Sequence, residues 1–248
     1  MSMMGQNPLE GWRRRSAPVM DYQSAAGSPA IATFFNAVYG WMAAGLALTG
    51  VVAGLVYNDQ TLMRQVFNGP ALLILFVAEI ALVWTIAAAV HRLSATAATV
   101  LFLLYAAING LTLSGIFVVY AIADIAVAFV ITAAMFGAMS LYGMVTRTDL
   151  SRLGSILFMA LIGLIIATIV NIFLRSPGLE FLLSYLGVAI FCGLTAWDTQ
   201  RLRYIAVSTS GDAAMASRLA ISGALALYLD FINLFLFLVQ ILGNSRRR

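Results

Sequence analysis

The chain has 248 residues, of which 62% are hydrophobic and only 10% are charged. A soluble domain carries about 25% charged residues, because its surface has to be polar. This composition therefore excludes an ordinary soluble domain and indicates a surface that faces lipid. The net charge of +4 comes from arginines spread over short loops and two tails, with no lysine, and this scatter argues against nucleic acid as a partner.

Seven apolar runs follow a polar N-terminal segment. Residues 1–30 are rich in Gly, Pro, Ser and Gln, and we predict a disordered cytoplasmic tail there. The runs are long enough for helices of about 20 residues that cross a bilayer, and much too long for barrel strands of about 10 residues. In chain order they are Ile31–Tyr57, Pro70–Val90, Ala97–Tyr120, Ile125–Val145, Leu153–Leu174, Phe181–Trp197 and Leu219–Gly243.

The predicted fold class is thus an all-α membrane protein with seven transmembrane helices over residues 31–243, followed by a short basic tail at 244–248. The third and fourth runs are almost continuous, which predicts a tight hairpin near Asp124. The sixth run is the shortest, so the alternative is six spans and one re-entrant segment. Small residues let helices approach closely in lipid, and two sets predict such contacts. These sets are Gly50 with Gly54, and Ala106, Gly110 and Ser114.

Arginine placement predicts the orientation, because basic residues are enriched in cytoplasmic loops. With the N-terminus inside, nine arginines of the first tail and the connecting segments lie on the inner side, and two lie outside. Seven spans then put Arg246, Arg247 and Arg248 outside, which opposes the trend. We predict a cytoplasmic N-terminus and leave the side of the C-terminus open.

Two carboxylates lie near the middle of apolar runs. Asp230 follows Leu219 by eleven residues, which puts it roughly 16–20 Å from either end of its run. Glu79 is equally central in the second run. An acid at this depth costs at least about 2.5–3.5 kcal/mol, so it generally faces the bundle interior and has a partner. Each is either a protonated side chain bonded to a neighbouring helix or part of a proton or ion path.

A third acid, Asp198, lies at the end of the sixth run. By position alone it is best explained as an interfacial residue that pairs with Arg201 three residues later. No arginine lies at mid-bilayer depth, so the acids must be protonated, share protons, or use an arginine from a helix end. Two ionised carboxylates in contact would suit a hard cation with oxygen ligands, such as Ca²⁺.

Enzyme chemistry has little support in the sequence. His91 is the single histidine and Cys192 the single cysteine, which excludes a histidine-rich metal site and an internal disulfide framework. The common nucleophile, phosphate-binding and metalloprotease motifs are absent. We therefore expect no enzymatic activity and no cofactor.

Several stretches resemble one family across nearly the whole chain after residue 30. Asn109–Phe117, Met135–Gly143 and Asp149–Leu174 are similar to its third, fourth and fifth helices, and Ala196–Gln200 and Ala224–Phe235 resemble its sixth and seventh. On these motifs the chain resembles bacterial members of the Bax inhibitor-1 family, the transmembrane BAX inhibitor motif proteins.

The resemblance implies a fold in which six helices pack around a central seventh. It also implies that Asp198 and Asp230 form a paired-aspartate pH sensor in a calcium leak path, with Glu79 at a further acidic position of the second helix. The family pattern includes an arginine latch near the end of that helix. Here the matching position is Val90, with His91 and Arg92 next, so Arg92 is the candidate latch.

The leading hypothesis is a proton-sensitive Ca²⁺ leak channel in a bacterial inner membrane, with Asp198 and Asp230 as ion ligands. At low pH the aspartates share protons and the path is shut, and as pH rises they ionise and the bundle loosens around the seventh helix. The first alternative is a modulator of membrane-protein quality control that binds a membrane-embedded protease through the N-terminal tail or Thr146–Arg152. The second is a proton-coupled transporter.

Overall fold

The computed structural model describes residues 29–89 and 92–245. All regular secondary structure in these residues is helical, and seven of the helical segments are long and apolar enough to cross a membrane. The helices are α3 (Pro29–Asn58), α4 (Gln60–Phe67), α5 (Ala71–Ala89), α6 (Ala95–Leu113), α7 (Ile116–Val119), α8 (Ile122–Val145), α9 (Ser151–Leu174), α10 (Pro177–Ser208) and α11 (Ala213–Ser245). The predicted all-α membrane fold is confirmed.

Capping side chains in the connecting segments fix where several helices begin. Asp59 accepts hydrogen bonds from the amides of Thr61 and Leu62 at the start of α4, and Ser94 accepts from Ala97 at the start of α6. Ser176 caps α10 directly before Pro177, which suits the first helical turn. Both predicted tails lie mainly outside the described residues, since α3 already begins at Pro29 and α11 runs on to Ser245.

The helix α4 lies in a stretch that the sequence predicts only as a polar connection. It is short and amphipathic, and its buried residue Val66 faces the bundle. Phe67 from its end packs against Gly115 at the start of α7, and Met63 accepts a hydrogen bond from the Ser114 hydroxyl. The connection between α3 and α5 is therefore held onto the end of the α6–α7 segment.

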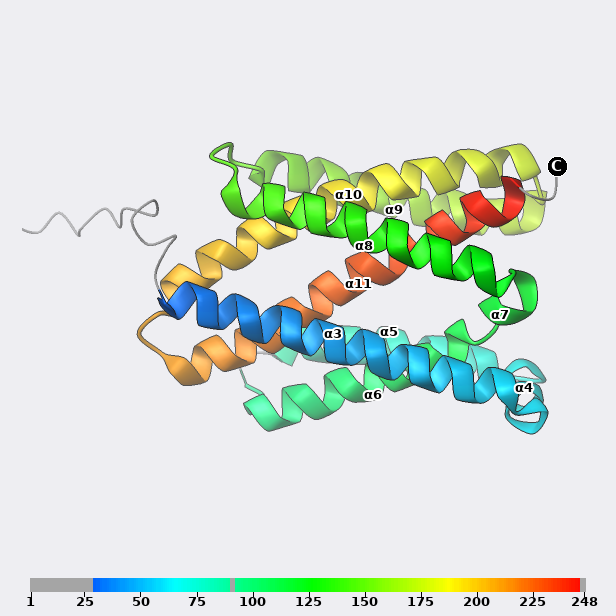
Figure 1. Ribbon diagram of the computed structural model, residues 1–248, viewed down its shortest axis with the longest axis horizontal. Coiled ribbons are helices and arrows are strands. Elements are labelled where there is room, and N and C mark those ends of the chain that lie inside the picture. The colour runs from blue at the N-terminus through cyan, green and yellow to red at the C-terminus, as the bar shows by residue number, and fades with distance from the viewer. Residues whose placement is uncertain (1–28, 90–91, 246–248) are drawn as a thin grey trace, which may run out of the picture.

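The helices form two groups of three with α11 between them. In one group α6 packs on both α3 and α5, and in the other α10 packs on both α8 and α9. Figure 1 shows α11 crossing diagonally from the first group to the second. It contacts α3, α6, α8 and α10, and it buries a larger share of its apolar span than any other described helix.

The tenth helix corrects one expectation from the sequence. The apolar run ends at Trp197, but α10 continues for three further turns to Ser208. It is therefore a long spanning helix and not a re-entrant segment, so the alternative with six spans is wrong. Asp198 lies well inside this helix and not at its end.

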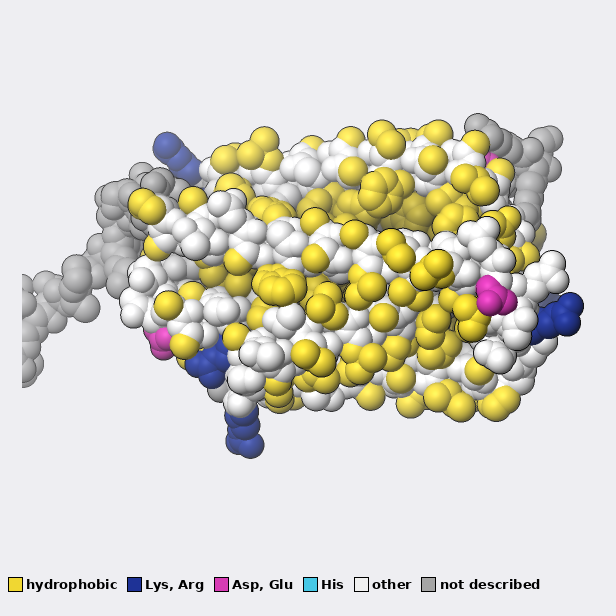
Figure 2. All heavy atoms as spheres, turned by 60° about the horizontal axis from the view of Figure 1, so that its bottom comes forward, with side chains coloured by type: hydrophobic (Ala, Val, Ile, Leu, Met, Phe, Trp, Pro, Cys, Tyr) yellow, Lys and Arg dark blue, Asp and Glu magenta, His cyan; other side chains and the backbone are white. Residues whose placement is uncertain are grey.

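The outer surface matches a hydrocarbon environment. Figure 2 shows hydrophobic side chains along the length of the bundle, with charged side chains at its two ends. The outer helices α5 and α9 expose large side chains such as Trp84, at 71%, and Phe173, at 82%. In water such exposed apolar side chains would favour aggregation, whereas in lipid they need no partner.

Glycine contacts confirm one of the two predicted small-residue sets. A Cβ on Gly110 would lie 2.8 Å from both the Thr49 carbonyl oxygen and Val52, so α3 and α6 approach closely there. Gly50 and Gly54 have no such neighbour within 4 Å, and the contact predicted for them is wrong. A tighter approach joins α8 to α10, where a Cβ on Gly143 would collide with the Ala196 carbonyl oxygen.

We expect Gly143→Ala to lower the free energy of unfolding by about 1–3 kcal/mol, because the backbone of α10 cannot move aside cheaply. Gly137→Ala is the matched control in the same helix, since its Cβ would meet no atom within 4 Å. Thermal unfolding of the two variants in detergent, followed by the monodisperse fraction after heating, compares them. Equal melting of both variants would contradict the close α8–α10 contact.

Candidate functional site

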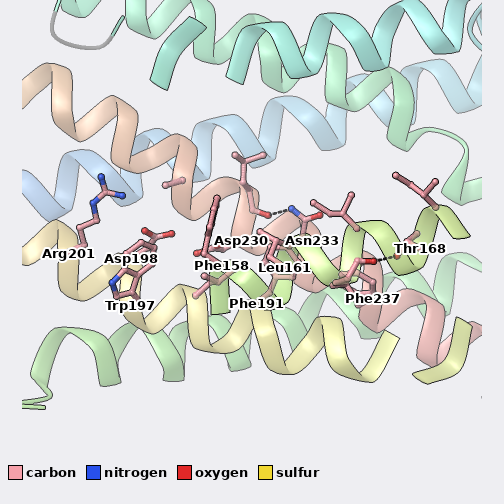
Figure 3. A pocket seen from close by; sticks show the side chains of 16 residues that line it. Phe158, Leu161, Thr168, Phe191, Trp197, Asp198, Arg201, Asp230, Asn233 and Phe237 are labelled. Atoms are coloured by element: carbon pink, nitrogen blue, oxygen red, sulfur yellow. Dashed lines mark hydrogen bonds between the residues drawn. The ribbon is translucent and has the colours of Figure 1, made fainter. Parts of the chain in front are cut away.

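Asp198 and Asp230 meet where α10 packs along α11. Both carboxyl groups line the same cavity, close enough for the charge of each to act on the other, and Asp230 is only 5% exposed. Figure 3 shows both side chains lining one pocket, from neighbouring helices. Thus the structure brings together the two aspartates that the resemblance paired.

A direct bond between the two carboxyl groups would require a proton, because one of them must donate and ionised carboxylates only accept. The Asp230 Oδ2 atom is buried without a hydrogen-bond partner among the described residues. Two negative charges cannot easily coexist in so poorly solvated a site. We therefore expect the two carboxyl groups to hold one proton between them.

Arg201 is the cation whose charge acts on the aspartate pair. Its positive charge acts on Asp198, one turn earlier in α10, and its guanidinium lies 5.7 Å from the centre of the Trp197 ring. Arg92, the candidate latch, lies exposed in the turn between α5 and α6. The structure therefore places Arg201, not Arg92, beside the aspartates.

Three adjoining cavities run along α11, and two of them meet at Asp198 and Arg201. The central one, of about 580 Å³, lies between α9, α10 and α11 and contains Asp198, Asp230 and Asn233. A second, of about 510 Å³, lies between α5, α10 and α11 and shares Asp198, Arg201, Ala226 and Leu229 with the first. A third, of about 400 Å³, shares Thr168 and Phe237 with the first and is lined by Asn171 and Gln240.

Glu79 lies in a different cluster, on the other side of α11. It is 8% exposed and accepts a hydrogen bond of 2.8 Å from the Thr112 hydroxyl. The Tyr228 hydroxyl donates to Asn109 Oδ1 at 3.1 Å. Glu79 does not line any of the three cavities. The three acids that the sequence predicts together thus form two separate sites that share α11.

The segment between α8 and α9 is fixed to α10 directly after Asp198. The Gln200 side chain accepts from the Leu150 amide and donates to the Thr148 carbonyl, each at 2.8 Å. Arg203 donates to the Met144 carbonyl at 2.7 Å. A shift of α10 at the aspartate pair would therefore move this connection as well.

The exposed Asp149 lies two residues before the start of α9. Its carboxylate accepts a hydrogen bond from the Ser151 amide at 2.9 Å, and this bond lowers the pKa of Asp149.

Comparison with known proteins agrees with this architecture. The family model described as inhibitor of apoptosis-promoting Bax1 matches residues 31–247. The chain belongs to the Bax inhibitor-1 family. It is 50% identical over 216 residues to inner membrane protein YbhL of Escherichia coli, covering 86% of this chain and 92% of the relative. An uncharacterized protein of Deinococcus radiodurans is 47% identical over 217 residues, covering 87% and 92% of the two chains.

Family membership confirms the resemblance that the helix motifs predict. It does not by itself assign a role to any side chain, so the roles of Asp198, Asp230, Glu79 and Arg92 stay predictions. Among the described residues, no three His, Cys, Asp or Glu side chains gather as a metal site. A cation at the pair would be held by two carboxylates and by neutral oxygens such as that of Asn233.

Sequence reasoning missed several buried polar residues that complete these sites. Asn109, Asn233 and Gln240 stand out in apolar runs, and their amide groups are a usable signal because an amide in hydrocarbon needs a partner. Thr49 gave no such signal, because a threonine can bond to its own helix backbone. Tyr228 gave no signal either, since tyrosines are common in membrane helices.

We expect the stability of the wild-type protein to fall as pH rises through the range in which the shared proton leaves. Two buried charges then repel, and loss of one proton corresponds to up to about 1.4 kcal/mol per pH unit. Asp230→Asn keeps the shape and supplies an amide donor, so its thermal midpoint should depend much less on pH. Thermal unfolding at a series of pH values measures this.

Asp212→Asn is the matched control, because Asp212 caps the start of the same helix through the Met215 amide and asparagine caps equally well. It should keep the wild-type pH dependence. If wild type and Asp230→Asn lose stability in parallel, the proton does not lie in the aspartate contact.

Proposed function

We propose that this protein is a proton-regulated leak channel for calcium ions, with Asp198 and Asp230 as the regulated ion site. One observation carries the proposal: the two carboxyl groups line the same cavity, which adjoins one further cavity on each side along α11. A proton held between the two carboxyl groups would occupy the place where a cation binds, so proton and cation compete.

The extent of the cavities supports a path across the membrane. Their lining residues on α11 run from Leu219 to Gln240, which corresponds to about 32 Å at 1.5 Å per residue. The hydrocarbon core of a bilayer is about 30 Å thick. Oxygen-bearing side chains recur along this length, and they are Ser222, Asp198, Asp230, Asn233, Thr168, Asn171 and Gln240.

The composition of the site favours passage over storage. Tight calcium sites use six to eight oxygen ligands, many of them carboxylates. Here two carboxylates are joined by neutral amide and hydroxyl oxygens, which would bind the ion only weakly. Conduction needs binding that is favourable enough for entry and weak enough for release.

In the proposed cycle the shared proton holds α10 against α11 at low pH. When the proton leaves, the charges repel, the α10–α11 contact loosens, and the pair becomes an oxygen site for Ca²⁺. Arg201 stands at the junction of two cavities and would moderate this charge. Because it lines both, it is a candidate for the latch role that the sequence predicts for Arg92.

We further propose a bacterial inner-membrane location with a cytoplasmic N-terminus. The relative from Escherichia coli is named an inner membrane protein, and the arginine distribution favours this orientation. The first alternative, binding of a membrane-embedded protease, would use residues 1–25 or Thr146–Arg152. The tail lies outside the described residues, and the second segment is fixed by Gln200.

Calcium entry into liposomes that contain the purified protein and an internal calcium dye tests the proposal. Wild-type flux should be low at acidic pH and rise as pH rises. Asp198→Asn and Asp230→Asn should remove this pH dependence and reduce flux at high pH at least about tenfold, because each removes a charged ligand. Asp212→Asn should behave like wild type.

Unchanged flux and pH dependence in both aspartate variants would overturn the proposed mechanism. Solute accumulation against its gradient, driven by protons, would instead identify a transporter. Deletion of residues 1–25 addresses the protease hypothesis, since it should leave calcium flux intact and abolish binding to such a partner.

A further inference from the structure

A second buried polar row crosses the bundle on the side of α11 away from the aspartate pair. The Tyr228 hydroxyl lies 2.6 Å from the Thr49 hydroxyl of α3 and donates to Asn109 of α6 at 3.1 Å. Thr49 in turn bonds to the Ala106 carbonyl at 2.8 Å. The row ends at Glu79 of α5, which accepts a hydrogen bond of 2.8 Å from the Thr112 hydroxyl, and this hydroxyl also lies 3.0 Å from the Asn109 carbonyl oxygen. Four helices are thus joined through one tyrosine hydroxyl and its neighbours.

The row has fewer hydroxyl protons than contacts. Tyr228 and Thr49 have one hydroxyl proton each, while the Ala106 carbonyl, Asn109 Oδ1 and the contact between the two hydroxyls all draw on them. The Tyr228 proton is therefore shared between Asn109 and Thr49. Loss of the Tyr228 hydroxyl removes both of its contacts at once.

Packing holds the tyrosine in this place. Tyr228 is fully buried, and its ring lies edge-to-face against Phe102 at 5.7 Å and against Tyr105 at 5.8 Å. Both rings belong to α6. The hydroxyl therefore has little freedom to find other partners, and its bonds report the rotation of α11 relative to α3 and α6.

Tyr228 and Asp230 are two residues apart, which separates them by about 200° around the helix. A rotation of α11 that takes Asp230 away from Asp198 must therefore also move Tyr228 relative to α3 and α6. At a side-chain radius of about 6 Å, a rotation of roughly 20° moves the tip by about 2 Å. This displacement is enough to break a hydrogen bond of normal length.

We propose that Tyr228 is a positioning residue for the Asp198–Asp230 pair, held by Thr49 and by Asn109. The row keeps α11 in the rotation in which the two aspartates line the same cavity. The inference deepens the proposed function and rests on it for the flux measurement. Among the described residues, four titratable or charged groups surround α11 at this level, and they are Asp198 and Arg201 on α10, Tyr105 on α6 and Glu79 on α5. The Tyr39 hydroxyl of α3 bonds to Ser140 of α8.

Tyr228→Phe tests the inference, because it removes the hydroxyl and keeps the ring. Loss of a hydrogen bond that exists only in the closed rotation should raise calcium leak at acidic pH by about two- to tenfold. It should also move the flux midpoint to lower pH by up to about one unit, since a tenfold change in an equilibrium linked to one proton shifts its midpoint by one unit. The control Tyr105→Phe alters the neighbouring ring outside the row and should keep the wild-type curve.

Thr49→Val supplies a second variant of nearly the same shape. It should shift the flux midpoint in the same direction. The double variant with Tyr228→Phe should shift the midpoint no further than the larger single effect, because both substitutions remove the same bond between Thr49 and Tyr228. Additive shifts would mean that the two residues act separately and would overturn the shared row.

Infrared spectra of the reconstituted full-length protein separate this inference from the proposed function. The carbonyl band of the protonated pair, assigned by its loss in Asp230→Asn, should vanish at a lower pH in Tyr228→Phe than in wild type. If wild type conducts no calcium but the band moves, the positioning role stands and the channel proposal falls. If the band does not move, Tyr228 does not position the pair, whatever the flux shows.

Discussion

Hydrocarbon offers no hydrogen bonds, and this constraint governs every polar side chain in the interior of the bundle. In water, an amide or carboxyl group that loses its partner is rehydrated, whereas here it must find another partner within the protein. The interior polar residues accordingly join different helices: Tyr39 of α3 with Ser140 of α8, Ser140 with Thr199 of α10, and Ser184 of α10 with Gln240 of α11. These bonds fix how the helices are turned, which apolar packing in lipid specifies only weakly.

Helix α11 is the element on which these contacts converge. Its Asp230 faces α10, and its Tyr228 faces α3 and α6, so its two sides are tied to the two groups of helices. A change of charge on one side therefore has a mechanical consequence on the other. Gln200 and Arg203 extend the same connection from α10 to the end of α8 and the start of α9. In the proposed mechanism, loss of the proton from the aspartate pair therefore also displaces the connection between α8 and α9.

Much of this could be predicted from the sequence, and the failures have physical causes. Asp230 and Glu79 were identified by depth alone, because a central acid in an apolar run is costly. Asp198 was not, since the polar residues after Trp197 look like a loop. The helix continues there because the polar side chains find partners inside the bundle, as Thr199 does with Ser140 and Gln200 with the Leu150 amide. The spacing of three residues predicts Arg201 as the cation beside Asp198, and the structure agrees.

The sequence by itself determined that the chain spans a membrane, where most spans lie, and how deep Asp230 and Glu79 sit. These follow from hydropathy and from the rise of 1.5 Å per residue, which are properties of single helices. Only the tertiary structure decided which acids share a site: Asp198 and Asp230 line one cavity, while Glu79 bonds to Thr112 on the side of α11 where Tyr228 bonds to Asn109. Depth leaves the direction of a side chain around its helix open. That direction is set by close contacts such as Gly110 with Thr49 and by hydrogen bonds between helices far apart in the chain.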